Sequence, residues 1–153
     1  MSELNKEIEE LKDNHVIEKL KLLQYIDDKT DEDIEPAIEC FVKEDMIKTW
    51  ESIANNAQDK SMDTLVKILW ETMCKGAGFE FEVEKSDNGI QIKCSYCPYV
   101  DLAKKAGSLK MGYRVYCASD DYIVAGFNDN IGFKRTKTLM EGHDCCDHFY
   151  YLK

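Results

Sequence analysis

The stretch FEFEVEKSDNGIQIKC (residues 79–94) contains the pattern that decides the fold class. Apolar and charged residues alternate strictly in FEFEVE, so Phe79, Phe81 and Val83 share one face of an extended chain. The alternation returns in IQIKC (residues 90–94) after KSDNG, which is a turn sequence. We therefore expect a β-hairpin with one face buried and the other in water.

Upstream of this hairpin, apolar residues recur at the spacing of an amphipathic helix. Three such helices are expected: one over residues 3–27, a second whose apolar stripe runs from Ile38 to Ala57, and a third from Ser61 onward. Pro36 fits the first turn of the second helix, where a missing N–H costs little. Stripes of this kind are typical of helices that pack on a core.

Downstream of the hairpin, the sequence mixes short extended and helical patterns. GYRVYC (residues 112–117) is strand-like, and ASDDYIVAGF (residues 118–127) is a short segment after it. IGFKRTKTLM (residues 131–140) and EGHDCCDHFYYLK (residues 141–153) are expected to supply two strands that pair. The predicted fold class is α+β, with N-terminal helices followed by a mostly antiparallel β-sheet with interspersed helices.

The chain of 153 residues has the length of a single domain. Its charge is uneven, because residues 1–60 hold 17 acidic and 8 basic side chains, whereas residues 61–153 hold 13 and 12. We therefore expect one domain over residues 1–153, with an acidic helical part and an α+β part that carries the chemistry. Nucleic-acid binding needs a basic surface and is not expected.

The sequence also gives expectations about membranes and location. It has no run of apolar residues long enough to span a bilayer, so no membrane association is expected. The first residues, MSELNKEIEELKDNH, are acidic and lack the apolar segment of a secretory signal. The protein is therefore expected in the cytoplasm.

Cysteine is unusually frequent, with seven residues in the chain. In a reducing compartment these cysteines are not expected to form a disulfide framework. Cys40 and Cys74 fall in helical patterns, where buried structural thiols explain them. The other five follow residue 93 and are the candidates for chemistry.

The first candidates lie in KCSYCPYVDLAKKAG (residues 93–107). Proline favours the first position of a helix, which places Cys97 at the N-cap of a helix that ends at Gly107. A thiol at a helix N-terminus faces unpaired N–H groups and the positive end of the helix dipole. That setting favours the nucleophilic thiolate, although a cysteine there can also simply cap the helix. Cys94 has only its spacing from Cys97 in favour of a role.

Two later segments, CASD (residues 117–120) and GHDCCDHF (residues 142–149), add polar side chains. CASD places Cys117 and Asp120 one helical turn apart, so they can face one spot. If Cys146 lies on a strand, His148 shares its face and Cys145 points away.

The same residues suit two other kinds of site. Cys94 and Cys97 have the spacing of a zinc knuckle, which Cys117, Cys146 or His148 can complete. Zinc is therefore a candidate cofactor, with Cys97, Cys117, Cys146 and His148 as its ligands. A redox Cys-x-x-Cys pair is less well supported, because the expected strands are antiparallel rather than part of a βαβ unit.

Three segments together resemble a known family of bacterial proteins, the L-2-amino-thiazoline-4-carboxylic acid hydrolases. They are CPYVDLAKKAG, VYCASDDYIVAGFN and FKRTKTLMEGHDCC, and the resemblance covers roughly residues 60–153. The positions that match its motifs are Cys97, Cys117, Asp120, Gly142 and Cys146. Cys94 is outside the pattern, and His148 stands where an aromatic residue is usual. The fold implied is also similar to ligand-binding domains of the vinyl-reductase type.

The resemblance implies hydrolysis of a carbon–nitrogen bond in a cyclic, amidine-like ring. In this hypothesis Cys97 attacks the ring carbon, and Asp120 or His143 transfers protons. Cys117 and Cys146 complete the site, either beside the nucleophile or as ligands of a metal that activates water.

A carboxylate on the substrate needs a cation, and Arg114 and Arg135 are the only arginines. The expected partner is thus a small-molecule substrate, and a homo-oligomer is possible. The alternative is a non-catalytic sensor module that holds a metal or small molecule with the same cysteines.

Overall fold

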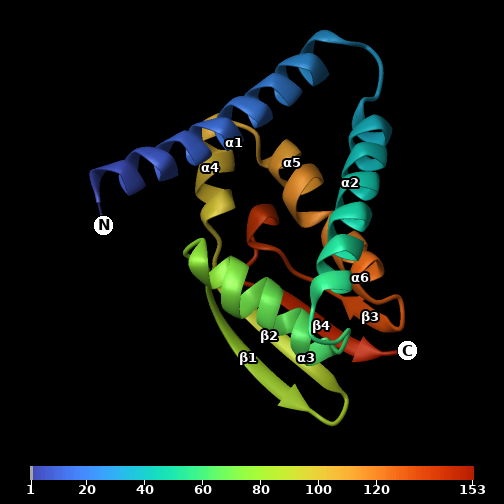
Figure 1. The fold of residues 1–153 in the computed structure, drawn as a ribbon. Coiled ribbons are helices and arrows are strands. Elements are labelled where there is room, and N and C mark those ends of the chain that lie inside the picture. The colour runs from blue at the N-terminus through green and yellow to red at the C-terminus, as the bar shows by residue number, and fades with distance from the viewer. Residues whose placement is uncertain (1) are drawn as a thin grey trace.

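A computed structural model describes residues 2–153, and Figure 1 shows their arrangement. The helical elements in chain order are α1 (Glu3–Lys29), α2 (Glu35–Asn56), α3 (Met62–Val66), η1 (Lys67–Cys74), α4 (Pro98–Ala106), α5 (Leu109–Gly112), η2 (Tyr113–Cys117), α6 (Asp120–Phe127) and η3 (Leu139–Glu141). The strands are β1 (Glu80–Ser86), β2 (Gly89–Tyr96), β3 (Ile131–Lys134) and β4 (Cys146–Leu152). The α+β class and the order of helices before the sheet are confirmed.

The three N-terminal helices begin where local chemistry favours it. The side chains of Ser2 and Ser61 accept backbone N–H groups at the starts of α1 and α3. α2 has Pro36 in its first turn, as the sequence predicts. The helix that begins with α3 continues directly as the π-helical segment η1.

The sheet is antiparallel, and its strand order is β1-β2-β4-β3. β1 and β2 form the predicted hairpin, and β3 pairs with β4 as expected. Gly89 has φ +149° at the start of β2, and a Cβ there would overlap the Tyr150 carbonyl oxygen of β4. This glycine therefore allows the close approach of β2 and β4, which places Cys94 directly opposite Cys146.

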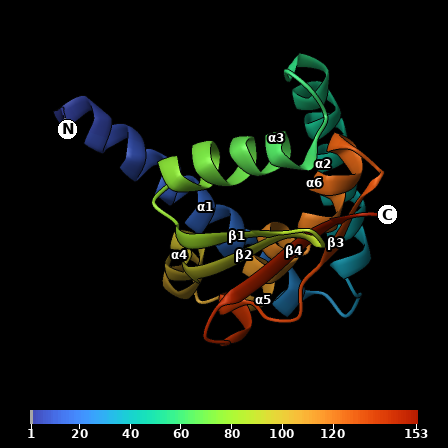
Figure 2. The ribbon, with the colours of Figure 1, turned by 90° about the horizontal axis from the view of Figure 1, so that it is seen from below.

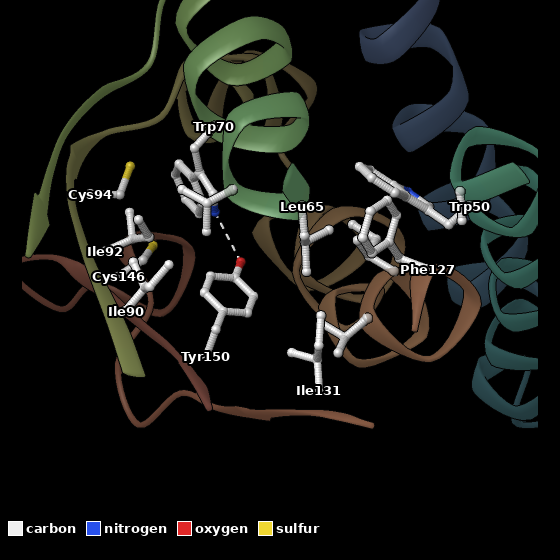
Figure 3. Close-up of a cluster of buried hydrophobic side chains, with 14 residues drawn as sticks. Trp50, Leu65, Trp70, Ile90, Ile92, Cys94, Phe127, Ile131, Cys146 and Tyr150 are labelled. Carbon is white, nitrogen blue, oxygen red and sulfur yellow. Dashed lines mark hydrogen bonds between the residues drawn. The ribbon is translucent and has the colours of Figure 1, made fainter. Parts of the chain in front are cut away.

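The continuous helix of α3 and η1 crosses one face of the sheet (Figure 2). Trp70 of η1 donates its indole N–H to the buried Tyr150 hydroxyl over 2.9 Å, as Figure 3 shows. Alternate residues of β4 point toward this helix, so Cys146, His148 and Tyr150 are buried while the residues between them are more exposed.

A second cluster of buried side chains lies where α1, α4 and α5 gather beyond one end of the sheet (Figure 1). Leu20, Val42 and Met111 belong to it. Cys97 and Leu139 pack against both clusters, so the cysteine motif lies where they meet.

Two predictions made from the sequence were wrong, one for residues 112–117 and one for Cys40. The strand-like GYRVYC is helical, because it continues α5 without a break and Gly112 packs closely against Ala103 and Met140. Cys40 was expected to be buried, but it is exposed on the outer side of α2.

The segment ASDDYIVAGF forms mainly α6. Gly107 ends α4, as predicted, and has the left-handed conformation. Within residues 2–153, no helix combines the length and the apolar character needed to cross a bilayer.

Candidate active site

A cavity of about 340 Å³ lies between α2, η1, the sheet and the segment from α4 to α6. The side chains that line it are those of Met46, Thr49, Trp50, Ile53, Leu69, Trp70, Met73, Cys74, Ala77, Phe79, Cys94, Cys97, Tyr99, Tyr116, Cys117, Ser119, Asp120, Ile123, Arg135, Met140, Cys146 and His148. Five of the seven cysteines and one cluster of charged groups thus surround a single space.

Cys146 is the first residue of β4, so it lies between strand β2 and the segment that leads into β4. It is 7% exposed and faces Cys94 across the β2–β4 pair. Its sulfur accepts the Leu139 backbone N–H over 3.2 Å, from the loop that precedes β4. The Cys94 thiol donates to the Tyr96 carbonyl oxygen over 3.2 Å and also interacts with the Cys146 thiol.

The two facing thiols ionise very differently. The interaction with the Cys94 thiol lowers the pKa of Cys146 against the effect of burial, and the Leu139 N–H and the charge of His148 act in the same direction. The pKa of Cys94 is raised by its hydrogen bond to Cys146 and by burial. Cys146 is therefore the member of the pair that ionises near neutral pH.

Asp120, the first residue of α6, connects two cationic or protonatable groups at the cavity. One of its carboxylate oxygens accepts from His148 Nε2 over 3.0 Å and forms an ion pair with Arg135. Arg135 also donates to the Cys117 carbonyl oxygen over 2.9 Å and to the Tyr113 hydroxyl over 3.4 Å. The charges of Asp120 and Arg135 therefore compensate each other within the fold.

His148 is 6% exposed and lies on β4 two residues after Cys146, on the same face of the strand. Its ring contacts Trp70 edge to face, with centroids 4.8 Å apart. Nε2 is held by Asp120, whereas Nδ1 is buried and has no hydrogen-bond partner within residues 2–153. The Tyr116 hydroxyl is in the same situation. Both residues line the cavity, so each atom is open to a hydrogen bond from a ligand or a water molecule there.

Cys97 lies at the N-cap of α4 with Pro98 after it, as the sequence predicts. The expected activation is not found there. Burial raises the pKa of the Cys97 thiol to about 11, although the N–H groups of Tyr99 and Val100 oppose this shift. The stabilisation of the thiolate by the helix end is thus smaller than the cost of burying its charge.

The other cavity thiols are also held in the neutral form. Burial and the charge of Asp120 raise the pKa of Cys117 well above its ordinary value. Burial likewise raises the pKa of Cys74 to about 12. Cys74 was not singled out in the sequence, because its position in a helical stripe gives no sign that the stripe lines a cavity.

His143 and Arg114 lie away from the cavity. His143 is exposed, accepts the Thr138 N–H at Nδ1, and lines a separate open pocket with Asp101 and Lys104. Arg114 is 39% exposed and pairs with Glu35 of α2. His143 was proposed for its place beside Cys146 in the sequence and Arg114 as one of only two arginines, but neither side chain lines the cavity.

The proposed zinc ligands do not assemble. Among residues 2–153, no three His, Cys, Asp or Glu side chains gather at a spacing that suits a metal ion. Cys97, Cys117, Cys146 and His148 all line the cavity, and Cys146 and His148 share one face of β4, but within the described part of the chain they do not come together as a metal-binding group. The residues present thus do not fit a resident zinc ion.

Comparison with solved structures gives a weak overall likeness. The crystal structure of a trafficking protein particle complex subunit 3 from Naegleria fowleri covalently bound to palmitic acid has a TM-score of 0.48 and 15% sequence identity, over 99% of this chain and 97% of that chain. No feature of that protein is transferred to this one at such a level of similarity. No curated protein sequence matches the chain significantly.

Comparison with protein families gives a clear result. Residues 14–150 match the model of the family described as L-2-amino-thiazoline-4-carboxylic acid hydrolase. The match extends beyond the motif region to α2 and most of α1, so it includes every wall of the cavity. The protein therefore belongs to the L-2-amino-thiazoline-4-carboxylic acid hydrolase family.

Proposed function

We propose that the protein hydrolyses the carbon–nitrogen bond of a cyclic, amidine-like ring, with Cys146 as the nucleophile. One observation carries the proposal. A thiol with a lowered pKa and a carboxylate-bound imidazole lie on one face of β4, at a cavity of a chain in a hydrolase family. This differs from the assignment made from sequence, in which Cys97 attacks.

The reaction takes place in two stages. The Cys146 thiolate adds to the ring carbon between nitrogen and sulfur, and a new sulfur–carbon bond forms. The ring nitrogen takes up a proton and leaves as an amine, which breaks the carbon–nitrogen bond. Water then adds to the same carbon and expels the Cys146 thiolate, so the net change is the addition of one water molecule.

His148 and Asp120 supply the proton transfers in this scheme. Asp120 holds Nε2 and fixes the orientation of the ring. Nδ1, which lacks a partner in the folded chain, gives the proton to the leaving nitrogen and later accepts one from water. The roles are those of a nucleophile, a base and an orienting carboxylate.

Turnover of 2-aminothiazoline-4-carboxylate and of 2-aminothiazoline, followed by mass spectrometry, tests the proposal. Cys146→Ser is expected to abolish the gain of one water by the ring. Cys145→Ser is the matched control, because Cys145 is also buried but does not line the cavity. Equal turnover by both variants would rule Cys146 out as the nucleophile.

A non-catalytic ligand-binding module is the second candidate. The observation that favours it is the raised pKa of Cys74, Cys94, Cys97 and Cys117, which makes four of the five cavity thiols unreactive near neutral pH. Ring binding without turnover in the wild-type protein would establish this candidate in place of the hydrolase.

The proposal also includes the setting in which the protein works. All seven cysteines are free, as is usual in a reducing compartment, so we place the protein in the cytoplasm. No nucleic-acid partner is part of the proposal, and the substrate is a small molecule.

A further inference from the structure

The walls of the cavity are far more apolar than a small carboxylated ring requires. α2 contributes Met46, Trp50 and Ile53, and η1 contributes Leu69 and Met73 on the opposite side. A volume of about 340 Å³ is in the range of pockets that bury drug-sized ligands. A single five-membered ring at Cys146 leaves most of this space unfilled.

The charged groups are confined to one part of the lining. Asp120, Arg135 and His148 contact one another, and Cys146 lies on the same strand face as His148. The walls from α2 and η1 supply no charged side chain to the cavity, and Thr49 is their only hydroxyl. The cavity therefore has a reactive polar end and an apolar arm.

Among the described residues, no guanidinium or ammonium group is free to bind a substrate carboxylate, and the positive charge of His148 is paired with Asp120 and with the Cys146 thiolate. Arg135 is the only Lys or Arg side chain that lines the cavity among residues 2–153, and it is 10% exposed. Its charge is compensated by Asp120, and it also donates to the Cys117 carbonyl and the Tyr113 hydroxyl. A carboxylate placed in the cavity would therefore lose its hydration without gaining an unpaired positive charge.

The apolar arm reaches the surface and can adapt to its contents. Met73 lines it and is 49% exposed, so it marks the mouth between η1 and the opposite wall. Met46 of α2 also lines the arm, and unbranched methionine side chains adjust to ligands of different shape. The bound molecule thus extends from the thiolate toward Met73.

We infer that the substrate is an amidine-like ring that bears an apolar alkyl or aryl arm in place of a carboxylate. This inference rests on the proposed function for the chemistry at Cys146 but not for the shape of the cavity. The ring occupies the end with Cys146 and His148, and the arm lies between the aliphatic and aromatic side chains of α2 and η1.

Binding and turnover of four compounds test the inference: 2-aminothiazoline, its 4-carboxylate, and its 4-butyl and 4-hexyl derivatives. Binding is measured by calorimetry on Cys146→Ser, which cannot turn the ring over. Each added methylene is expected to tighten binding by about fourfold. Turnover by the wild-type protein is expected to follow the same order in kcat/KM.

Leu69→Trp fills the apolar arm, so the hexyl compound is expected to bind this variant no more tightly than unsubstituted 2-aminothiazoline does. Leu22→Trp is the matched control, because Leu22 is 60% exposed on α1 and outside the cavity. If Leu69→Trp does not fold, Met73→Trp at the mouth serves the same purpose.

The outcomes separate this inference from the proposed function. Tighter binding of the carboxylate than of the hexyl compound would overturn the apolar arm, whether or not the ring is hydrolysed. Tight binding of the hexyl compound without turnover of any ring would overturn the hydrolase and keep the apolar ligand. Equal binding of all four compounds would contradict the inference directly.

Discussion

The surroundings of individual sulfur atoms decide which cysteine can act. Cys97 has the helix end that sequence reasoning favoured, yet its thiol pKa is raised to about 11 because burial dominates. Cys146 is also buried, but the Leu139 N–H and the Cys94 thiol stabilise its anion. Donors aimed at the sulfur therefore matter more here than the dipole of a short helix.

Alkylation by iodoacetamide tests this difference between thiols. Since the pKa of Cys146 is lowered, its rate of labelling should level off near neutral pH. The rate for Cys97 should still be rising at pH 9, because its pKa is about 11. Peptide mass spectrometry gives the rate for each cysteine.

Cys40 is the internal reference for that experiment, since it is exposed and far from the cavity. A pH profile for Cys146 that follows the profile of Cys97 would contradict the assignment of the thiolate. Slow labelling that levels off near neutral pH would still support it, because only access through the cavity is then limiting.

Asp120 is expected to stabilise the fold through its ion pair with Arg135. Asp120→Asn removes the charge that compensates Arg135, whose side chain is 10% exposed. The expected loss of unfolding free energy is about 3 kcal/mol, measured by urea denaturation. The double variant Asp120→Asn with Arg135→Met should regain part of this loss, and no regain would show that the ion pair is not the cause.

At the scale of elements, the strands were predictable and the later helices were less so. The alternation in residues 79–94 predicts the β1–β2 hairpin, and the structure has it. GYRVYC contains residues that favour strands, but it follows α5 directly and its backbone is helical. Tertiary packing around Gly112 favours the helical backbone of this segment, and a local sequence pattern does not contain that packing.

The contact between α2 and α6 sets the position of Asp120. A Cβ on Gly126 would lie 2.7 Å from the Ile47 carbonyl oxygen, so the two helices approach only because this residue is glycine. Gly126→Ala is expected to lower the unfolding free energy by about 1–3 kcal/mol and to reduce ring turnover.

Gly76→Ala is the matched control for that change. Gly76 lies in the helical turn after η1, and a Cβ there would meet no atom within 4 Å. It should leave turnover unchanged and stabilise the protein by up to about 1 kcal/mol. An unaltered stability of Gly126→Ala would show that α6 can move away from α2 at little cost.

At the scale of the whole molecule, the site is assembled from distant parts of the chain. Strand alternation was enough to predict that Cys146 and His148 share a face, and both line the cavity. The meeting of Asp120 with His148 and Arg135 depends on the order β2-β4-β3 and on where α6 begins. The sequence contains neither the strand order nor the start of α6, so it could not exclude His143 and Arg114, which lie outside the cavity.

The sequence also did not show which apolar side chains line a cavity and which fill the core. The helical stripes of α2 and η1 were predicted to be core, and part of each lines the cavity instead. Cys74 belongs to one of them. A stripe that lines a cavity and a stripe that fills a core have the same period, so only the three-dimensional arrangement separates them.

Removal of metal ions tests the correction of the zinc hypothesis. Because the residues described here include no cluster of three suitable ligands, a chelator such as EDTA should leave the melting temperature unchanged. Elemental analysis of the purified protein is the direct readout. One zinc per chain, lost in Cys146→Ser, would contradict this expectation and restore the ligand set inferred from sequence.

The most direct measurement is the site of the covalent intermediate. The protein is mixed with 2-aminothiazoline or its hexyl derivative, quenched with acid within the first turnover, and digested for peptide mass spectrometry. The adduct is predicted on the peptide that contains Cys146, and it should be absent from Cys146→Ser and present in Cys145→Ser. An adduct on Cys97 or Cys117 would contradict the central claim, as would turnover that persists in Cys146→Ser.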